Sequence, residues 1–185
     1  MDSADRTYDE WLALRCQTGE REAFEDLILA MERPLRYYAT KFTGSDERAI
    51  DVLQEVWLLV FRKIGQLKEP AALRPWLYRL TRGVAVDHLR HTVTRRRAED
   101  DFASQFDEAA EPDFDKADAE AVHQALDALD PVCREVLVLQ FMEDFGISQI
   151  AEVIGCPVGT VKSRIHYAKK QLKEILERGG YGTKK

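Results

Sequence analysis

The sequence predicts an all-α protein with two small helical domains, joined by a flexible acidic linker, of which the C-terminal one holds a helix-turn-helix. Apolar residues recur at spacings of three and four on both sides of the linker, and no segment alternates with a period of two. The charge is also divided unevenly. Residues 1–98 hold 17 basic and 15 acidic residues (net +2), residues 99–120 hold 1 and 10 (net −9), and residues 121–185 hold 9 and 8 (net +1). The two expected domains are therefore residues 1–98 and 121–185, and residues 99–120 are the expected linker.

Three helices are expected first, over residues 8–16, over residues 20–40, and from a cap at Ser45 or Asp46 to near Gly65. Pro34 lies inside the second, and proline lacks the backbone donor that a helix interior needs, so a kink or break there is possible. Ser and Asp are favoured N-cap residues because their side chains accept hydrogen bonds from free backbone N–H groups. The apolar residues of the third helix are Ile50, Leu53, Val56, Trp57, Val60, Phe61 and Ile64.

A fourth helix is expected from Leu73 to Arg97, after a short loop over residues 66–72. At 100° per residue, its residues Trp76, Leu77, Leu80 and Val84 share one arc, and Arg79, Arg82 and Arg90 share another. The only acid between Pro70 and Ala98 is Asp87. A charged run is often no more than a solvated face, but a long basic ridge beside a tryptophan favours contact with nucleic acid.

The acidic linker, 99–120, has little apolar surface to bury and repels itself, so it is expected to be flexible. Phe102, Phe106 and Phe114 interrupt this pattern. They suggest that the linker docks when a partner is present, although a solvated tether with incidental aromatics fits the sequence equally well.

After the linker, helices are expected through Leu126 and Leu129, behind Pro131, and over residues 147–154 and 158–177. The last two are joined by Gly155, Cys156 and Pro157, the geometry of a helix-turn-helix whose second helix enters the major groove. One stripe of the last helix is apolar: Val161, Ile165, Ala168, Leu172 and Leu176. The opposite arc and its flanks carry polar and cationic residues that can reach base edges and phosphates: Thr160, Lys162, Ser163, Arg164, His166, Lys169, Lys170 and Lys173.

Other classes of function find no support in the sequence. We see no phosphate-binding loop, nucleophile motif or metal-ligand spacing, so we expect no enzyme activity, no cofactor and no metal. Cys16, Cys133 and Cys156 are odd in number and widely spaced, which indicates reduced thiols. The longest apolar run, VWLLVF, is too short to span a membrane, and the N-terminus is acidic, so a cytoplasmic location is expected.

Two stretches of the chain resemble conserved regions of the extracytoplasmic-function (group four) sigma factors of bacterial RNA polymerase. Residues 19–90, with GEREAFEDLI, DVLQEVWLLVFRKI and WLYRLTRGVAVDHLR, resemble region two. Residues 126–172, with LDALDPVCREVLVL and IAEVIGCPVGTVKSRIHYAKKQL, resemble region four. Some positions differ from the usual pattern: Gly83 replaces a common asparagine, and Gly146 and Gln149 replace a serine cap and a glutamate.

The resemblance implies a partner for each region. Region two would bind the clamp helices of the polymerase β′ subunit through Asp51, Gln54, Glu55 and Trp57. It would melt and hold the −10 promoter element, with Arg74, Trp76, Arg79 and Arg82 on the DNA side and Arg90 further along the same basic ridge. Region four would read the −35 element with residues 160–170 and touch the β flap, and the acidic linker would thread the core enzyme.

Two functions remain open from the sequence. One is an initiation factor that gives core RNA polymerase its promoter specificity. The other is an autonomous helix-turn-helix repressor or activator, which would bind an operator tightly by itself, usually as a dimer. Two domains that must expose polymerase-binding surfaces also suggest an anti-sigma factor as a regulatory partner.

Overall fold

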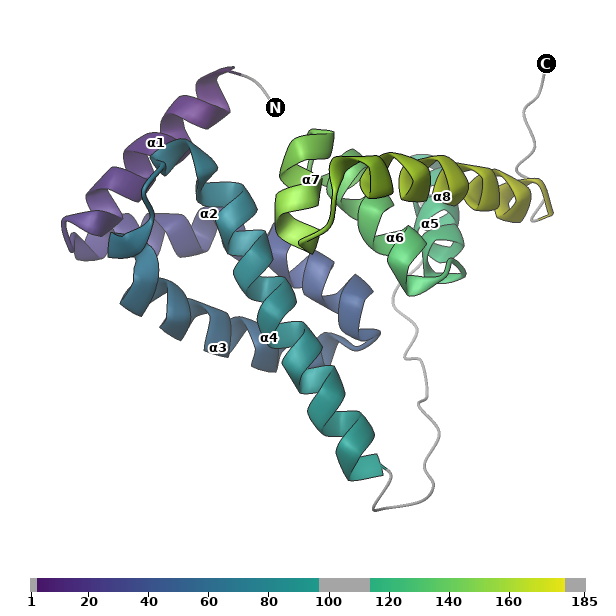
Figure 1. Cartoon of the computed structure of the whole chain (residues 1–185), viewed down its shortest axis with the longest axis horizontal. Coiled ribbons are helices and arrows are strands. Elements are labelled where there is room, and N and C mark those ends of the chain that lie inside the picture. Colours follow the sequence, from purple (N-terminus) through teal and green to yellow (C-terminus); the bar gives the residue numbers. More distant parts are fainter. Residues whose placement is uncertain (1–2, 97–113, 179–185) are drawn as a thin grey trace.

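The computed structural model describes residues 3–96 and 114–178, with side-chain surroundings for residues 7–90 and 121–178. Over these ranges the chain is helical and contains no strand, which confirms the all-α fold class. Helices α1–α4 form one block and α5–α8 a second block beside it (Figure 1). No helix in the described ranges is both long and apolar enough to cross a membrane.

The N-terminal block contains α1 (Ser3–Gln17), α2 (Arg21–Thr43), α3 (Asp46–Lys63) and α4 (Leu73–Arg96), with short 3₁₀ turns at Ile64–Gln66 and Pro70–Ala72. The helix α2 runs without a break through Pro34. Its residues Leu27, Met31, Leu35 and Tyr38 are all buried, and this packing outweighs the cost of a proline, about 3 kcal/mol in a helix interior.

The predicted start of α3 is confirmed by its cap. Ser45 is extended, and its hydroxyl accepts a hydrogen bond from the backbone N–H of Arg48 at 3.4 Å. Gly44, just before it, ends α2 with a left-handed φ of 69°, a conformation that glycine adopts without strain. The two helices therefore meet at a sharp corner.

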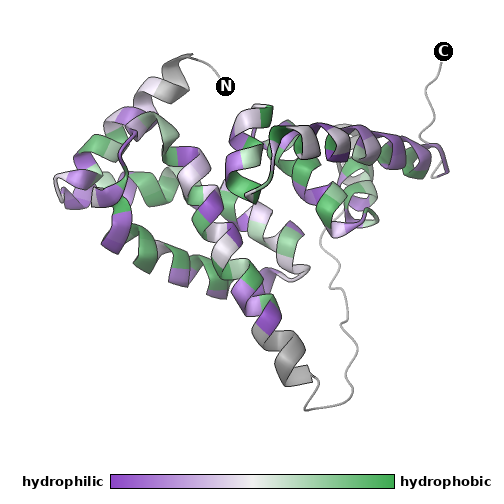
Figure 2. Cartoon of the chain, viewed as in Figure 1, coloured by the Kyte–Doolittle hydropathy of each residue, from purple (hydrophilic) through white to green (hydrophobic). Residues whose placement is uncertain are grey.

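The apolar residues of α3 do not all face the core. Leu53, Val56, Val60 and Ile64 are buried, and Trp57 is half-buried. Ile50 is 39% exposed, and Phe61 is 70% exposed although its ring centre lies 5.2 Å from that of Phe24 of α2. In Figure 2 α3 alternates between hydrophobic and hydrophilic segments, whereas α8 is predominantly hydrophilic.

The C-terminal block contains α5 (Phe114–Asp127), α6 (Pro131–Leu137), a π-helical turn (Val138–Met142), α7 (Ile147–Ile154) and α8 (Val158–Arg178). Because α5 begins at Phe114, the last seven residues of the predicted flexible linker, 99–120, are helical instead. Residues 97–113, with Phe102 and Phe106, lie outside the described residues.

The two blocks pack together along a seam between α2 and α4 on one side and α6 and α7 on the other (Figure 1). Three aromatic rings cross it in sequence. The rings of Tyr38 and Tyr78 have centroids 5.1 Å apart, and the rings of Tyr78 and Phe145 are 5.0 Å apart, both edge to face. All three side chains are buried, so the seam belongs to a continuous apolar core.

Candidate nucleic-acid interface

The helix α8 turns one apolar face inward and one cationic face outward. Val161, Ile165 and Ala168 are fully or almost fully buried, as the stripe predicts. Leu172 and Leu176 are only half-buried, because α8 extends beyond the rest of the block (Figure 1). Four of the residues predicted to contact DNA form the exposed cationic arc: Lys162, His166, Lys169 and Lys170.

The turn before α8 has the geometry that the sequence predicts. Gly155 ends α7 with a φ of 72°, and its N–H bonds the Ala151 carbonyl at 2.9 Å. At the start of α7, the Gln149 side-chain oxygen accepts a hydrogen bond from the Gly146 N–H at 3.0 Å. Gln149 thus performs half of a capping box although the usual serine and glutamate are absent.

The polar residues near the start of α8 differ in their exposure and in their contacts. Ser163 is exposed and its hydroxyl donates to the Thr160 carbonyl at 2.9 Å. Arg164 is half-buried, with one guanidinium nitrogen 3.9 Å from the Cys156 sulfur. Lys169 lies with its ammonium 5.0 Å from the centre of the Phe141 ring. This arc can therefore offer exposed cations to phosphates and a hydroxyl to a base edge.

The four arginines of α4 whose side chains the structure describes are paired with carboxylates. Arg79 contacts Glu152 of α7 at 3.2 Å, and Arg82 contacts Glu135 of α6 at 2.8 Å. Within its own block, Arg74 bonds the buried Asp9 at 2.5 Å. Further along the helix, the exposed Arg90 pairs with Asp87 at 3.5 Å.

Trp76 packs in the core and is 8% exposed. The sequence analysis placed it on the apolar arc of α4 and, by resemblance, on the DNA side. In this structure its ring is covered, so it offers no open surface for an unstacked base. Contact with DNA would need a different arrangement of its neighbours.

The residues of α3 that were predicted to bind polymerase lie on one exposed side of that helix. Asp51, Gln54 and Glu55 are exposed, and Glu55 bonds His88 of α4 at 3.1 Å. Trp57 is half-buried beside them. These residues are thus close enough to act as one surface.

Two apolar residues on the same helix were not predicted to belong to this surface. Leu58 is 61% exposed and Phe61 is 70% exposed. They follow Asp51 and Gln54 at helical spacings of seven, that is, two turns further along. That spacing could have indicated from the sequence that both residues belong to this surface, although Phe61 also fits the spacing of the buried residues of α3. An exposed face with acidic and apolar residues is typical of a protein-binding site.

The described residues show no group of three or more His, Cys, Asp or Glu side chains able to hold a metal ion. The three cysteines are free thiols, and burial raises the pKa of Cys16 to about 11.

Two protein-family models match the chain. Sigma-70 region 2 matches residues 27–97, which covers α3 and α4, and Sigma-70 region 4 matches residues 119–172, which covers the helix-turn-helix. Both lie at the places where the sequence resembles those regions.

Similar proteins span nearly the whole chain. The RNA polymerase sigma-H factor of Pseudomonas aeruginosa is 30% identical over 91% of this chain and 94% of its own length. The ECF RNA polymerase sigma-E factor of Haemophilus influenzae is 26% identical over 94% and 98%. The factor EcfG of Rhodopseudomonas palustris is 31% identical over 84% and 86%.

The fold is also similar to solved structures. The first is the sigma factor RpoE in complex with the anti-sigma factor NepR from Bartonella quintana, with a TM-score of 0.74, 23% identity, and coverage of 83% of this chain and 96% of that one. The second is CnrH in complex with the cytosolic domain of CnrY, with a TM-score of 0.67, 24% identity, and coverage of 92% and 97%.

Proposed function

The chain belongs to the extracytoplasmic-function family of RNA polymerase sigma factors and so acts in transcription initiation, and we propose that it binds core RNA polymerase and directs it to specific promoters. In this role it contributes specificity, and catalysis belongs to the polymerase. The observation that supports the proposal most directly is the match of both sigma regions, in order, to the two helical blocks.

The exposed face of α3 is the proposed polymerase contact. Asp51, Gln54, Glu55 and Trp57 would bind the β′ clamp helices, and Leu58 and Phe61 would add apolar area. Their exposure supports this assignment because a free surface of large apolar side chains is stabilised when a partner covers it.

The exposed arc of α8 is the proposed contact with the −35 element. Lys162, Lys169 and Lys170 would neutralise phosphates, and His166 would contact the backbone beside them. Thr160, Ser163 and Arg164 would approach base edges at the start of the helix. The β flap would contact the same block. We propose that the −10 element is melted and held by α4 through Arg74, Arg79, Arg82 and Arg90. Trp76, which is covered in this structure, would join them only after its neighbours rearrange.

Regulation by an anti-sigma factor is part of the proposal. One of the two similar solved structures is titled as a sigma factor bound to an anti-sigma factor, and the other as CnrH bound to the cytosolic domain of CnrY. We propose that this chain has a partner of the same kind. Recovering the protein from its native cells without a bound inhibitor, under non-inducing conditions, would count against it.

Co-elution with purified core RNA polymerase on size exclusion tests the proposed function. Stoichiometric co-elution is expected, and it should be weakened by Gln54→Ala, Trp57→Ala and Leu58→Ala. Leu29→Ala on α2 is the matched control, because Leu29 is 78% exposed but lies on another helix. No association with core enzyme, together with tight binding of the free protein to a duplex operator, would favour the autonomous repressor instead.

A further inference from the structure

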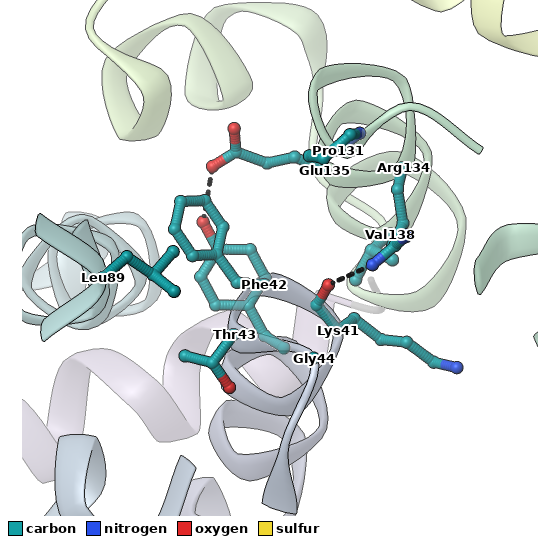
Figure 3. Close-up of a pocket in the computed structure, with 10 residues that line it drawn as sticks. Lys41, Phe42, Thr43, Gly44, Leu89, Pro131, Arg134, Glu135 and Val138 are labelled. Carbon is teal, nitrogen blue, oxygen red and sulfur yellow. Dashed lines mark hydrogen bonds between the residues drawn. The ribbon is translucent and has the colours of Figure 1, made fainter. Parts of the chain in front are cut away.

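A pocket of about 350 Å³ lies where the end of α2 meets α4 and α6 (Figure 3). Its wall is mostly apolar and comes from both blocks, with Phe42, Leu89, Pro131 and Val138. Protein interiors are close-packed and contain few voids larger than a water molecule. Small-molecule sites, in contrast, have volumes from about 300 Å³ upward, are lined mainly by apolar side chains with a few polar groups, and often lie between domains. The size and the lining of this pocket are those of a small-molecule site.

The aromatic wall of the pocket is fixed by its neighbours. The Phe42 ring centre lies 6.1 Å from that of Tyr38, and the Arg82 guanidinium carbon lies 5.8 Å from the Phe42 ring centre. Arg82 is itself bonded to Glu135 at 2.8 Å. A wall that is already ordered lowers the entropy cost of binding, and an aromatic wall favours contact with another ring.

Arg134 places a guanidinium at the edge of this pocket, beside the Lys41 carbonyl (Figure 3). Among the residues that the structure describes, its acceptors are all backbone carbonyls, at 2.6 to 3.1 Å: those of Leu126, Lys41, Asp127 and Leu129. A guanidinium has five N–H donors and no acceptor. In this part of the chain, one N–H of Arg134 is therefore left for an oxygen atom of a ligand, and its positive charge has no carboxylate beside it.

The other two charged residues that line the pocket are already paired. Lys41 bonds Asp127 at 2.6 Å, and Glu135 accepts from Arg82 Nε and from the Tyr38 hydroxyl, each at 2.8 Å. A ligand therefore meets one charge without a counter-ion in the described ranges, and that charge is positive. Because a charged group that leaves water needs a partner of opposite sign, the pocket favours an anion over a cation.

We propose that this pocket binds a small aromatic carboxylate of two fused rings, with its carboxylate on the remaining N–H of Arg134 and its rings against Phe42 and Leu89. The ring number follows from the volume, because a cavity of about 150 Å³ holds benzene and this pocket is roughly twice as large. Such a site goes beyond the proposed sigma-factor function, since it needs neither polymerase nor DNA. It would let a small molecule act on the chain directly.

The test measures binding of naphthalene carboxylate to the full chain by isothermal titration calorimetry. Naphthalene carboxamide is the matched control ligand, because it keeps the rings and an acceptor oxygen but has no charge. We expect the carboxylate to saturate at one molecule per chain and to raise the melting temperature, as a ligand of the folded state does. The carboxamide should bind about tenfold more weakly, since a hydrogen bond between charged partners is stronger than one to a neutral acceptor.

A pair of variants tests the location of the site. Leu89→Trp puts a larger side chain into the pocket, and overpacking of this kind should weaken carboxylate binding by about tenfold or more. Leu80→Trp is the matched control, because Leu80 is also half-buried on α4 but lies on the opposite side of the helix at about 100° per residue. It should leave the affinity within about twofold of the wild type. Circular dichroism compares the helix content of the two variants.

Nuclear Overhauser contacts between the naphthalene protons and the Phe42 ring locate the ligand in the wild type, so the decision does not depend on how a variant folds. The proposal is overturned if the carboxylate does not saturate at one molecule per chain, or if no contact to Phe42 is seen. Equal affinity of Leu89→Trp and Leu80→Trp would also overturn it. Equal affinity for the carboxylate and the carboxamide would overturn the anionic ligand class and the role of Arg134.

Discussion

Replacing Asp9 by Asn tests whether Arg74 anchors α4 to the N-terminal helix. Asp9 is 4% exposed and accepts from Arg74 Nε at 2.5 Å, whereas the Arg74 side chain is 25% exposed. Breaking a fully buried ion pair costs about 3–5 kcal/mol. Arg74 can still reach water, so we expect a smaller coupling of about 2 kcal/mol, within the range of charge-assisted hydrogen bonds.

A double-mutant cycle isolates this coupling. The free energy of unfolding is measured in urea for the wild type, Asp9→Asn, Arg74→Gln and the double variant. Each single variant should lose nearly as much stability as the double variant, with a melting temperature lower by about 4 to 8 °C for a chain of this size. Arg21→Gln is a suitable control because its pair with Glu25 is exposed on α2.

A coupling below about 0.5 kcal/mol, the value of an exposed pair, would refute the reasoning. Arg74 would then be free to act mainly on DNA. A coupling near 2 kcal/mol would make any loss of promoter binding in Arg74→Gln attributable in part to the position of α4.

Three further outcomes are expected. Gly155→Ala should cost about 1 kcal/mol in urea unfolding, because φ is 72° and only glycine adopts it freely, whereas Gly159→Ala inside α8 should be neutral or slightly stabilising. Burial raises the pKa of Glu143 by more than Tyr78 and Arg74 lower it, so the folded state binds this proton more tightly than the unfolded state does. The free energy of unfolding should therefore fall as the pH rises from about 4.5 through the pKa of the folded state. Glu143→Gln should flatten this pH dependence in urea titrations at several pH values, and an unchanged slope would contradict the prediction. Lys169→Ala should weaken binding to all −35 duplexes and reduce the salt slope by about one, whereas Arg164→Ala should change the preference at particular bases; a uniform loss in Arg164→Ala would show that it contacts only the backbone.

Local patterns predicted most of the helices because local physics decides them. The cap at Ser45, the glycine turn at Gly155 and the apolar stripe from Val161 to Ala168 each depend on residues a few positions apart. The early start of α5 was missed because its first turns lie within acidic sequence that composition alone assigns to a linker.

The candidate site was predicted less completely, and the reason is long-range pairing. Periodicity shows that Trp76 and the α4 arginines occupy different arcs, but it does not show that carboxylates of the second block pair with Arg79 and Arg82. Phe61 fits the buried spacing of α3 and is nevertheless 70% exposed, because the contact with the Phe24 ring of α2 covers it only in part. Helical spacing identifies faces, and only packing decides which faces are covered.

The sequence by itself determined that this protein is helical, that it has a helix-turn-helix with a cationic outer arc, and that it resembles the sigma factors. Those features follow from the backbone preferences and spacing of neighbouring residues. Only the tertiary structure decided that Glu135, one of the two charged residues of α6, is buried against Tyr38 and Arg82. Their separations of 97 and 53 residues leave no local pattern, because that contact exists only when the two blocks meet.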